Sequence, residues 1–264
     1  MKKLKILFLI FTLLALPIVT DAGNVVTMFK AQGGGAASGS CTSATAGEES
    51  TEYLACEDFE GSSACADSGV SVCRSTWKKY DANGTFNRTT GALEGTNSYA
   101  ISANWNSNGL QFTDAGTVYV FFKIRIHYVA TKADLPLIYL YNETTLHVGL
   151  ASADVSDGTS YILKLTGCGG DWSVVSGSLS YDTTYNIWIE YAKGTGANGV
   201  SSIYISSTST KGSAISTNTT HTCTTDVDNL RLGLYNQQYG TETYRIVLID
   251  HIRIGSSQMS GVPD

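Results

Sequence analysis

Hydrophobic and polar residues alternate with a period of two along several segments of the chain, and this pattern predicts β-strands. The clearest segment spans 116–128. Its apolar positions are Val118, Val120, Phe122, Ile124 and Ile126, and the positions between them are Tyr119, Phe121, Lys123, Arg125 and His127. Because successive side chains of a strand point to opposite faces, one face is expected in a hydrophobic core and the other on the surface.

The same alternation recurs later in the chain. In one segment Trp188 and Glu190 alternate with isoleucines and tyrosines, and in another Arg231 and Tyr235 alternate with leucines. Further strands are predicted near 98–102, 137–141, 146–150, 161–165 and 202–206. Turn-forming pairs such as Asp157-Gly158 separate these segments, and no stretch of a dozen residues keeps a helical period. The pattern therefore predicts an all-β protein, an antiparallel β-sandwich.

The N-terminus has the features of a secretory signal. Lys2, Lys3 and Lys5 precede a nearly continuous apolar run that ends at Val19, and Thr20-Asp21-Ala22 offers a cleavage site. We expect a signal peptide at 1–22, of bacterial type, and a secreted protein that is extracellular or periplasmic. An uncleaved membrane anchor is the alternative, although the apolar run is short for a spanning helix.

Composition distinguishes three segments after the predicted signal peptide. Residues 23–50 are rich in Gly, Ser and Thr and predict a flexible arm. The sandwich domain is expected at 51–256, followed by a polar tail at 257–264. The net charge of −6 disfavours nucleic acid and anionic membranes as partners. The oligomeric state is not indicated.

Six cysteines follow the predicted signal, and an even number in an exported chain favours disulfides. Six cysteines allow 15 connectivities. The pairing we predict is Cys65 with Cys73, Cys168 with Cys223, and Cys41 with Cys56. Because no C-x-x-C motif occurs and histidines are few, the thiols do not indicate a zinc site.

Two acidic segments enclose the predicted strands. Glu57-Asp58-Phe59-Glu60-Gly61 resembles the opening strand of concanavalin A-like lectin/glucanase jelly rolls, and 249–254 resembles their closing strand. The segment 91–101 is similar to a strand common in laminin-G-like members. The resemblance covers about 56–255 and implies a concanavalin A-like jelly roll.

The resemblance also implies one structural calcium ion between the first and last strands. Asp250 matches the carboxylate of the closing strand, and Glu60 is a neighbouring candidate. Calcium requires several oxygen ligands, so backbone carbonyl groups would complete the site. The alternative is that Asp250 interacts with Arg253 or with a turn amide.

The sequence does not favour an enzyme. The Glu-x-Asp-x-Glu strand of laminarinase-type glycosidases is absent, which leaves a glycoside hydrolase in doubt. A polysaccharide lyase that acts on an acidic glycan needs a base, a phenolic acid and a group that neutralises a carboxylate. Arg125, His127 and Tyr235, with Gln237 and Gln238 nearby, are the candidates for that alternative.

The main prediction is a carbohydrate-binding protein without cleavage activity. Aromatic rings can stack on sugars while polar and charged groups contact hydroxyls and carboxylates. The predicted ligand-binding residues are Tyr119, Lys123, Arg125, His127, Trp188, Glu190, Arg231 and Tyr235. Alternatively, their strands belong to different sheets and form ordinary outer faces. A structural or adhesive surface protein is a third possibility.

Overall fold

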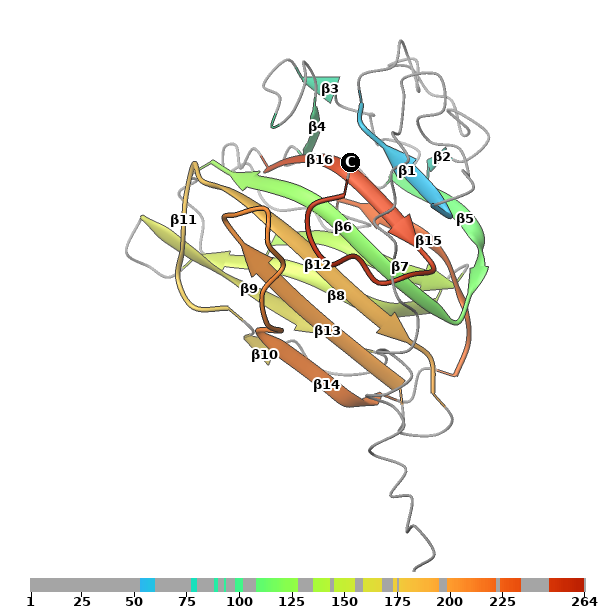
Figure 1. Ribbon diagram of the computed structural model, residues 1–264. Coiled ribbons are helices and arrows are strands. Elements are labelled where there is room, and N and C mark those ends of the chain that lie inside the picture. Colours follow the sequence, from blue (N-terminus) through green and yellow to red (C-terminus); the bar gives the residue numbers. More distant parts are fainter. Residues whose placement is uncertain are drawn as a thin grey trace, which may run out of the picture. The chain divides into compact units, whose positions relative to one another are not determined.

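The computed structural model describes residues 53–59, 77–79, 88–89, 93, 98–101, 108–127, 135–142, 145–154, 159–167, 173–174, 176–194, 199–221, 224–233 and 247–263. Within these ranges the regular elements are sixteen β-strands, and no helix occurs. The strands form two sheets of eight, and every strand pairing is antiparallel. The predicted all-β antiparallel sandwich is confirmed (Figure 1).

Sheet A contains the clearest predicted strand at its centre. Its order is β14 (Ser216–His221), β13 (Gly199–Ser206), β12 (Thr184–Ala192), β6 (Thr117–Ile126), β16 (Val247–Gly255), β4 (Ser98–Ile101) and β3 (Arg88–Thr89). The eighth strand, β1 (Ala55–Glu57), pairs with β16.

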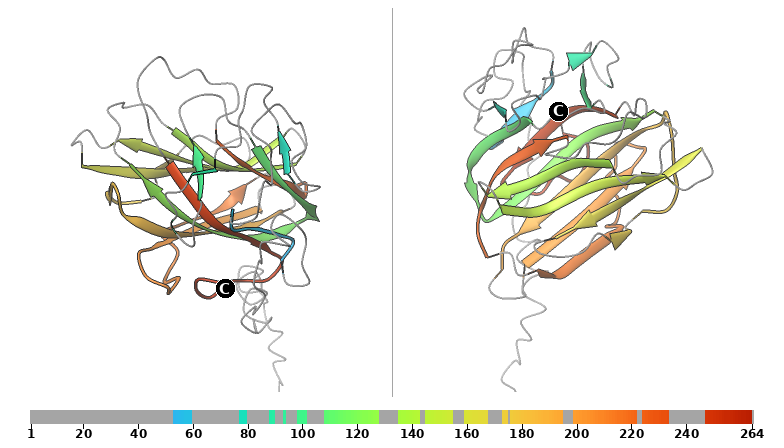
Figure 2. Two further views of the ribbon diagram at one scale, coloured as in Figure 1. Left: turned by 90° about the horizontal axis from the view of Figure 1, so that it is seen from above. Right: turned by 180° about the vertical axis from the view of Figure 1, so that it is seen from behind.

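Sheet B is the opposite layer (Figure 2). Its order is β10 (Ser173–Val174), β9 (Ser160–Thr166), β8 (Thr145–Asp154), β7 (Leu135–Asn142), β15 (Val227–Leu232), β5 (Asn108–Ala115) and β2 (Trp77–Lys79). The eighth strand, β11 (Leu179–Ser180), pairs with β9.

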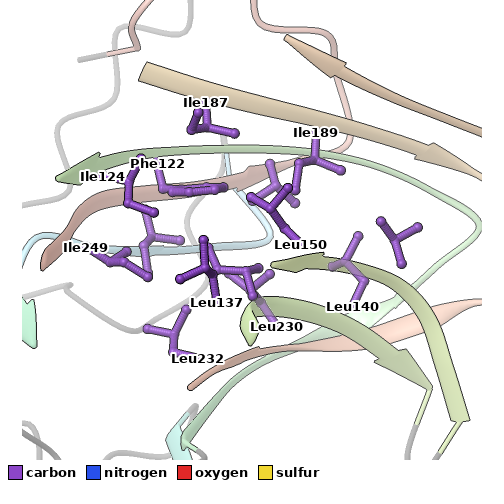
Figure 3. Close-up of a cluster of buried hydrophobic side chains, with 14 of the residues drawn as sticks. Phe122, Ile124, Leu137, Leu140, Leu150, Ile187, Ile189, Leu230, Leu232 and Ile249 are labelled. Atoms are coloured by element: carbon purple, nitrogen blue, oxygen red, sulfur yellow. The ribbon is translucent and has the colours of Figure 1, made fainter. Parts of the chain in front are cut away.

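The apolar positions of the two sheets pack against each other. Phe122, Ile124, Ile187, Ile189 and Ile249 of sheet A meet Leu137, Leu140, Leu150, Leu230 and Leu232 of sheet B (Figure 3). All ten side chains are buried. Since truncation of such a side chain to alanine costs about 2–5 kcal/mol, this layer is a main source of stability. The predicted core face of β6 is confirmed, whereas Tyr119 and Phe121 on its other face are also buried.

The two acidic segments that enclose the domain meet in space. β1 pairs with β16, with Ala55 opposite Ile254 and Glu57 opposite Ile252. Asp58 accepts a hydrogen bond from the buried guanidinium of Arg253, with Nη1 and Oδ1 2.5 Å apart. Opening and closing strands are therefore joined by both backbone and side chains.

β16 carries a bulge where its neighbour changes. Its residues 247–249 pair with β4, whereas 252–254 pair with β1. The register with β6 shifts between Asp250 and Arg253, and His251 has a positive φ of 52°. A β-bulge inserts one extra residue and re-aims the side chains around it. Asp250 lies at this point.

Several predictions fall outside the described residues. These are the signal peptide, the arm, the cysteines Cys41, Cys65, Cys73, Cys168 and Cys223, and the site candidates Glu60, Tyr235, Gln237 and Gln238. Cys56 is disulfide-bonded, but its predicted pairing with Cys41 stays a prediction. Within the described ranges, no helix is long and apolar enough to cross a membrane.

Candidate functional site

The outer face of sheet A is covered by the end of the chain. We call residues 256–263 the C-terminal strap. The Trp188 indole Nε1 donates to the carbonyl oxygen of Gly261 at 3.0 Å, and His251 Nε2 lies 2.8 Å from the carbonyl oxygen of Pro263. A β-bridge joins Gly261 to Thr210. The predicted polar tail thus packs across the sheet (Figure 1).

A buried carboxylate anchors this strap. Glu190 pairs with the ammonium group of Lys211 and accepts hydrogen bonds from Tyr204 Oη at 2.9 Å and from Gln258 Nε2 at 2.8 Å. Burial lowers the pKa of Lys211, and the hydrogen bond and charge of Glu190 oppose that shift. Burial, helped by Glu190, raises the pKa of Tyr119 to about 12. The carboxylate therefore faces protein donors under the strap.

Four of the eight predicted ligand-binding residues are buried, namely Arg231 on sheet B and three residues on sheet A near the strap. Trp188 is only 1% exposed, and Tyr119 and Glu190 are each 8% exposed. The sequence-based interpretation placed them on an open stripe. Because the strap contacts Trp188 directly, its ring is not available to stack on a sugar.

The remaining residues of that stripe are less deeply covered. Lys123 and Arg125 are half-buried on the outer face of β6, and their cross-strand neighbours on β12 are Asn186 and Thr184. His127 follows β6 and pairs with the exposed carboxylate of Asp182 through Nδ1. These three basic residues form a row along β6 and directly after it, on sheet A.

Arg231 does not join this row. It lies on β15, in the centre of sheet B, so the sandwich separates it from Arg125 and His127. The predicted ligand-binding residues are therefore divided between the two sheets, with those of β6 and β12 on sheet A and Arg231 on sheet B.

Arg231 is part of a polar cluster on the outer face of sheet B. Because Leu230 and Leu232 face the core, Arg231 points the other way. We define the Arg231 cluster as the outward-facing polar residues of β15 and its two neighbours. Its members are Gln111 of β5, Tyr139 and Tyr141 of β7, and Asn229 and Arg231 of β15.

Strand register brings these side chains together. Arg231 lies opposite Tyr139, and Asn229 lies opposite both Tyr141 and Gln111. Directly opposed residues of antiparallel strands have Cβ atoms about 4.5–5.5 Å apart, so their side chains interact. Three adjacent strands thus contribute polar groups to one patch.

The contacts inside the cluster hold the guanidinium in one orientation. Arg231 Nε donates to Asn229 Oδ1 at 2.9 Å, and its guanidinium carbon lies 3.7 Å from the centre of the Tyr141 ring. The rings of Tyr139 and Tyr141 meet edge to face, with centroids 5.9 Å apart. Arg231 is 5% exposed and Asn229 is fully buried, whereas both tyrosines are half-buried, so the guanidinium lies below the surface of sheet B.

This arrangement offers two chemical functions. The planar fork of an arginine matches a carboxylate and holds it through two hydrogen bonds. A phenol beside it can donate or accept a proton. Sequence reasoning missed Gln111, Tyr139, Tyr141 and Asn229. The alternation of tyrosines with apolar residues in 137–141 was the available signal for β7.

The surroundings of Asp250 do not fit the predicted calcium site. Its Oδ2 accepts from Ser98 Oγ at 2.8 Å and from the Leu93 amide at 3.2 Å, and its Oδ1 accepts from the His251 amide at 2.8 Å. Hydrogen-bond donors repel a cation, whereas calcium needs oxygen ligands. No group of three or more His, Cys, Asp or Glu residues suited to a metal occurs among the described residues. Glu60 lies outside them, so its role stays a prediction.

No family model matches the chain, and no curated protein matches it. Solved structures resemble its fold at low identity. An endo-β-1,4-glucuronan lyase from the fungus Trichoderma reesei is 12% identical, with a TM-score of 0.49 over 72% of this chain and 98% of that chain. An alginate lyase from Pseudomonas aeruginosa is 13% identical, with a TM-score of 0.48 over 68% and 88%. The receptor-binding domain of a botulinum neurotoxin is 14% identical, with a TM-score of 0.45 over 66% and 42%.

These findings correct the main functional prediction. A carbohydrate-binding sandwich without cleavage activity was expected, but the solved structures of similar fold include alginate and glucuronan lyases. The likeness is one of jelly-roll sandwich fold, and membership of the concanavalin A-like superfamily stays a prediction. The covered Trp188 removes the aromatic platform on which the earlier interpretation relied.

Proposed function

We propose that this protein is a polysaccharide lyase that cleaves an acidic, uronate-containing glycan at the Arg231 cluster. One observation carries the proposal: the guanidinium of Arg231 is held by Asn229 and by the Tyr141 ring, beside a second phenol, Tyr139. The fold likeness to alginate and glucuronan lyases is compatible with this function, but the residues of sheet B support it. Secretion, as the sequence predicts, would bring the enzyme to such a glycan.

The reaction is a β-elimination. A base removes the proton at C5, next to the uronate carboxylate, and negative charge develops on that carboxylate. The C4–O4 bond then breaks, a C4=C5 double bond forms, and the leaving oxygen takes up a proton. Positive charge placed where the negative charge develops stabilises the transition state.

The residues of the cluster suit these tasks. Arg231 would neutralise the carboxylate, and Asn229 would keep its guanidinium in place. Tyr139, directly opposite Arg231, is the candidate for proton exchange.

The proposal is tested by incubating the protein with alginate, polyglucuronate, polygalacturonate and a neutral β-glucan. A rise in ultraviolet absorbance marks the new double bond, and mass spectrometry shows products that lack one water relative to hydrolysis products. We expect both signals with at least one uronate polymer and neither with the neutral glucan. Reducing ends without the ultraviolet signal would identify a hydrolase instead. No cleavage of any polymer would contradict the proposal.

A further inference from the structure

The guanidinium of Arg231 does not lie over the ring of the residue directly opposite it on β7. That neighbour is Tyr139, yet the guanidinium stacks on Tyr141, which is the diagonal neighbour. The side chain therefore bends along its own strand toward Asn229, to which Nε donates. Two contacts therefore restrict its orientation, one with the Tyr141 ring and one with Asn229.

We propose that Tyr141 is a positioning residue that acts through the face of its ring and not through its hydroxyl group. It sets the plane of Arg231 so that the guanidinium meets a uronate carboxylate edge-on. This inference rests on the proposed lyase function and assigns different tasks to the two tyrosines of β7. Tyr139 exchanges the proton, and Tyr141 orients the cation.

The physics of cation–π stacking supports the orienting task that we assign to Tyr141. An aromatic face attracts a guanidinium through its π-electrons, and the attraction is larger where water is excluded. Arg231 is 5% exposed, so the contact lies in such an environment. Stacking engages the face of the guanidinium, and its N–H donors keep their directions within the plane. A bidentate contact with a carboxylate requires that plane to be fixed.

The proposal also predicts that lysine cannot replace Arg231, although it carries the same charge. A lysine at position 231 would keep the positive charge, but it has neither a plane to stack nor a rigid fork. The orientation that Tyr141 imposes would then have no effect. Arg231→Lys should therefore resemble the loss of the Tyr141 ring and not the wild type.

The test compares Tyr141→Phe, Tyr141→Leu and Arg231→Lys in the full-length mature protein. Binding of a uronate tetrasaccharide is measured by calorimetry in a Tyr139→Phe background, which limits turnover, and kcat and KM are measured on the polymer without that background. Tyr181→Leu is the matched control, because Tyr181 is also partly buried and lies outside the cluster. The Arg231 Nε–H signal in NMR spectra reports the ring current of Tyr141 without any substrate.

We expect Tyr141→Leu and Arg231→Lys each to weaken binding about tenfold and to raise KM by a similar factor. Tyr141→Phe should restore most of the affinity and keep the ring-current shift, which Tyr141→Leu should lose. If Tyr141→Leu does not fold, Arg231→Lys still tests the claim, since wild-type affinity with lysine would overturn it.

Two other results would overturn the positioning role. Equal losses for Tyr141→Phe and Tyr141→Leu would mean that the hydroxyl group acts, while the lyase function would stand. A wild-type protein that shows the ring-current shift but neither binds nor cleaves uronates would refute the lyase function, and the positioning role with it. The two failures are thus distinguishable.

Discussion

Trp188 donates its indole N–H to the carbonyl oxygen of Gly261 at 3.0 Å, which joins a central strand of sheet A to the C-terminal strap. Its ring packs against Phe121, with centroids 5.1 Å apart, and Phe121 meets His251 edge-on at 5.6 Å. The outer face of sheet A therefore holds a small aromatic layer of its own. We therefore expect this layer to serve stability and not ligand binding.

Replacement of Trp188 tests this interpretation. Trp188→Phe removes the hydrogen bond to Gly261 and part of the ring, so we expect the free energy of unfolding in urea to fall by about 1–3 kcal/mol. Ile215→Ser changes an exposed residue of the neighbouring loop, 43% exposed, and serves as the control. Unchanged stability with weakened glycan binding would show that Trp188 belongs to a ligand surface after all.

The ion pair beneath the strap gives a second prediction. Glu190→Gln leaves the buried ammonium of Lys211 without its counter-charge, which typically costs about 3–5 kcal/mol. Limited proteolysis should then release the C-terminal strap faster than in the wild type. The double variant Glu190→Gln/Lys211→Met should recover much of the loss, because no uncompensated charge remains. A double variant as unstable as Glu190→Gln would refute this explanation.

The burial of His147 leads us to predict that the stability of the protein depends on pH. It is 2% exposed, its Nδ1 lies 3.3 Å from Tyr191 Oη, and its Nε2 lies 3.0 Å from Thr225 Oγ1. Burial lowers its pKa from the ordinary 6.5, and the charge of Asp228 opposes this shift. Because the folded pKa lies below the unfolded one, the unfolded chain binds the proton more readily.

The contribution of His147 is therefore fully present above pH 6.5 and is lost as the pH falls from there toward the folded pKa. Urea unfolding between about pH 5 and about pH 8 should show this decline in the wild type. His147→Gln should flatten the slope in this window. If the free energy of unfolding varies with pH in His147→Gln as it does in the wild type, other titratable groups cause that variation.

The donors around Asp250 predict how the bulge of β16 responds to mutation. Asp250→Asn replaces one acceptor oxygen with a donor that faces other donors, so we expect a loss of about 2–4 kcal/mol in the free energy of unfolding. Ser98→Ala, which removes one donor, should cost about 1 kcal/mol. A chelator should leave the Tm of the wild type unchanged. A fall in Tm that calcium reverses would instead support the calcium site predicted from the sequence.

The period-two alternation was sufficient to predict the strands and the core face of β6, because alternation is a local property of the chain. It could not tell which strands share a sheet. Arg125 and Arg231 have similar sequence surroundings, yet they lie on opposite sheets. Strand order follows from packing among residues far apart in sequence.

The candidate site could be predicted only in part for the same reason. Arg231 was identified from its own strand, but Tyr139 and Tyr141 reach it through the pairing of β15 with β7, about 90 residues away in sequence. The alternation around Trp188 predicts an outward-facing tryptophan, which is uncommon and favours sugar binding. Its burial depends on the C-terminal strap, and no local pattern near Trp188 indicates that contact.

The most direct test of the proposed site compares two arginines on opposite sheets. Arg231→Ala and Arg125→Ala are assayed for the rate of unsaturated product formation from the best uronate polymer, and both are checked for wild-type folding by urea unfolding. We predict that Arg231→Ala lowers kcat/KM by at least about a hundredfold, as expected when a group that stabilises developing charge is removed. Arg125→Ala should lower it far less. A larger loss with Arg125→Ala, or an active Arg231→Ala protein, would contradict the assignment of the site to sheet B.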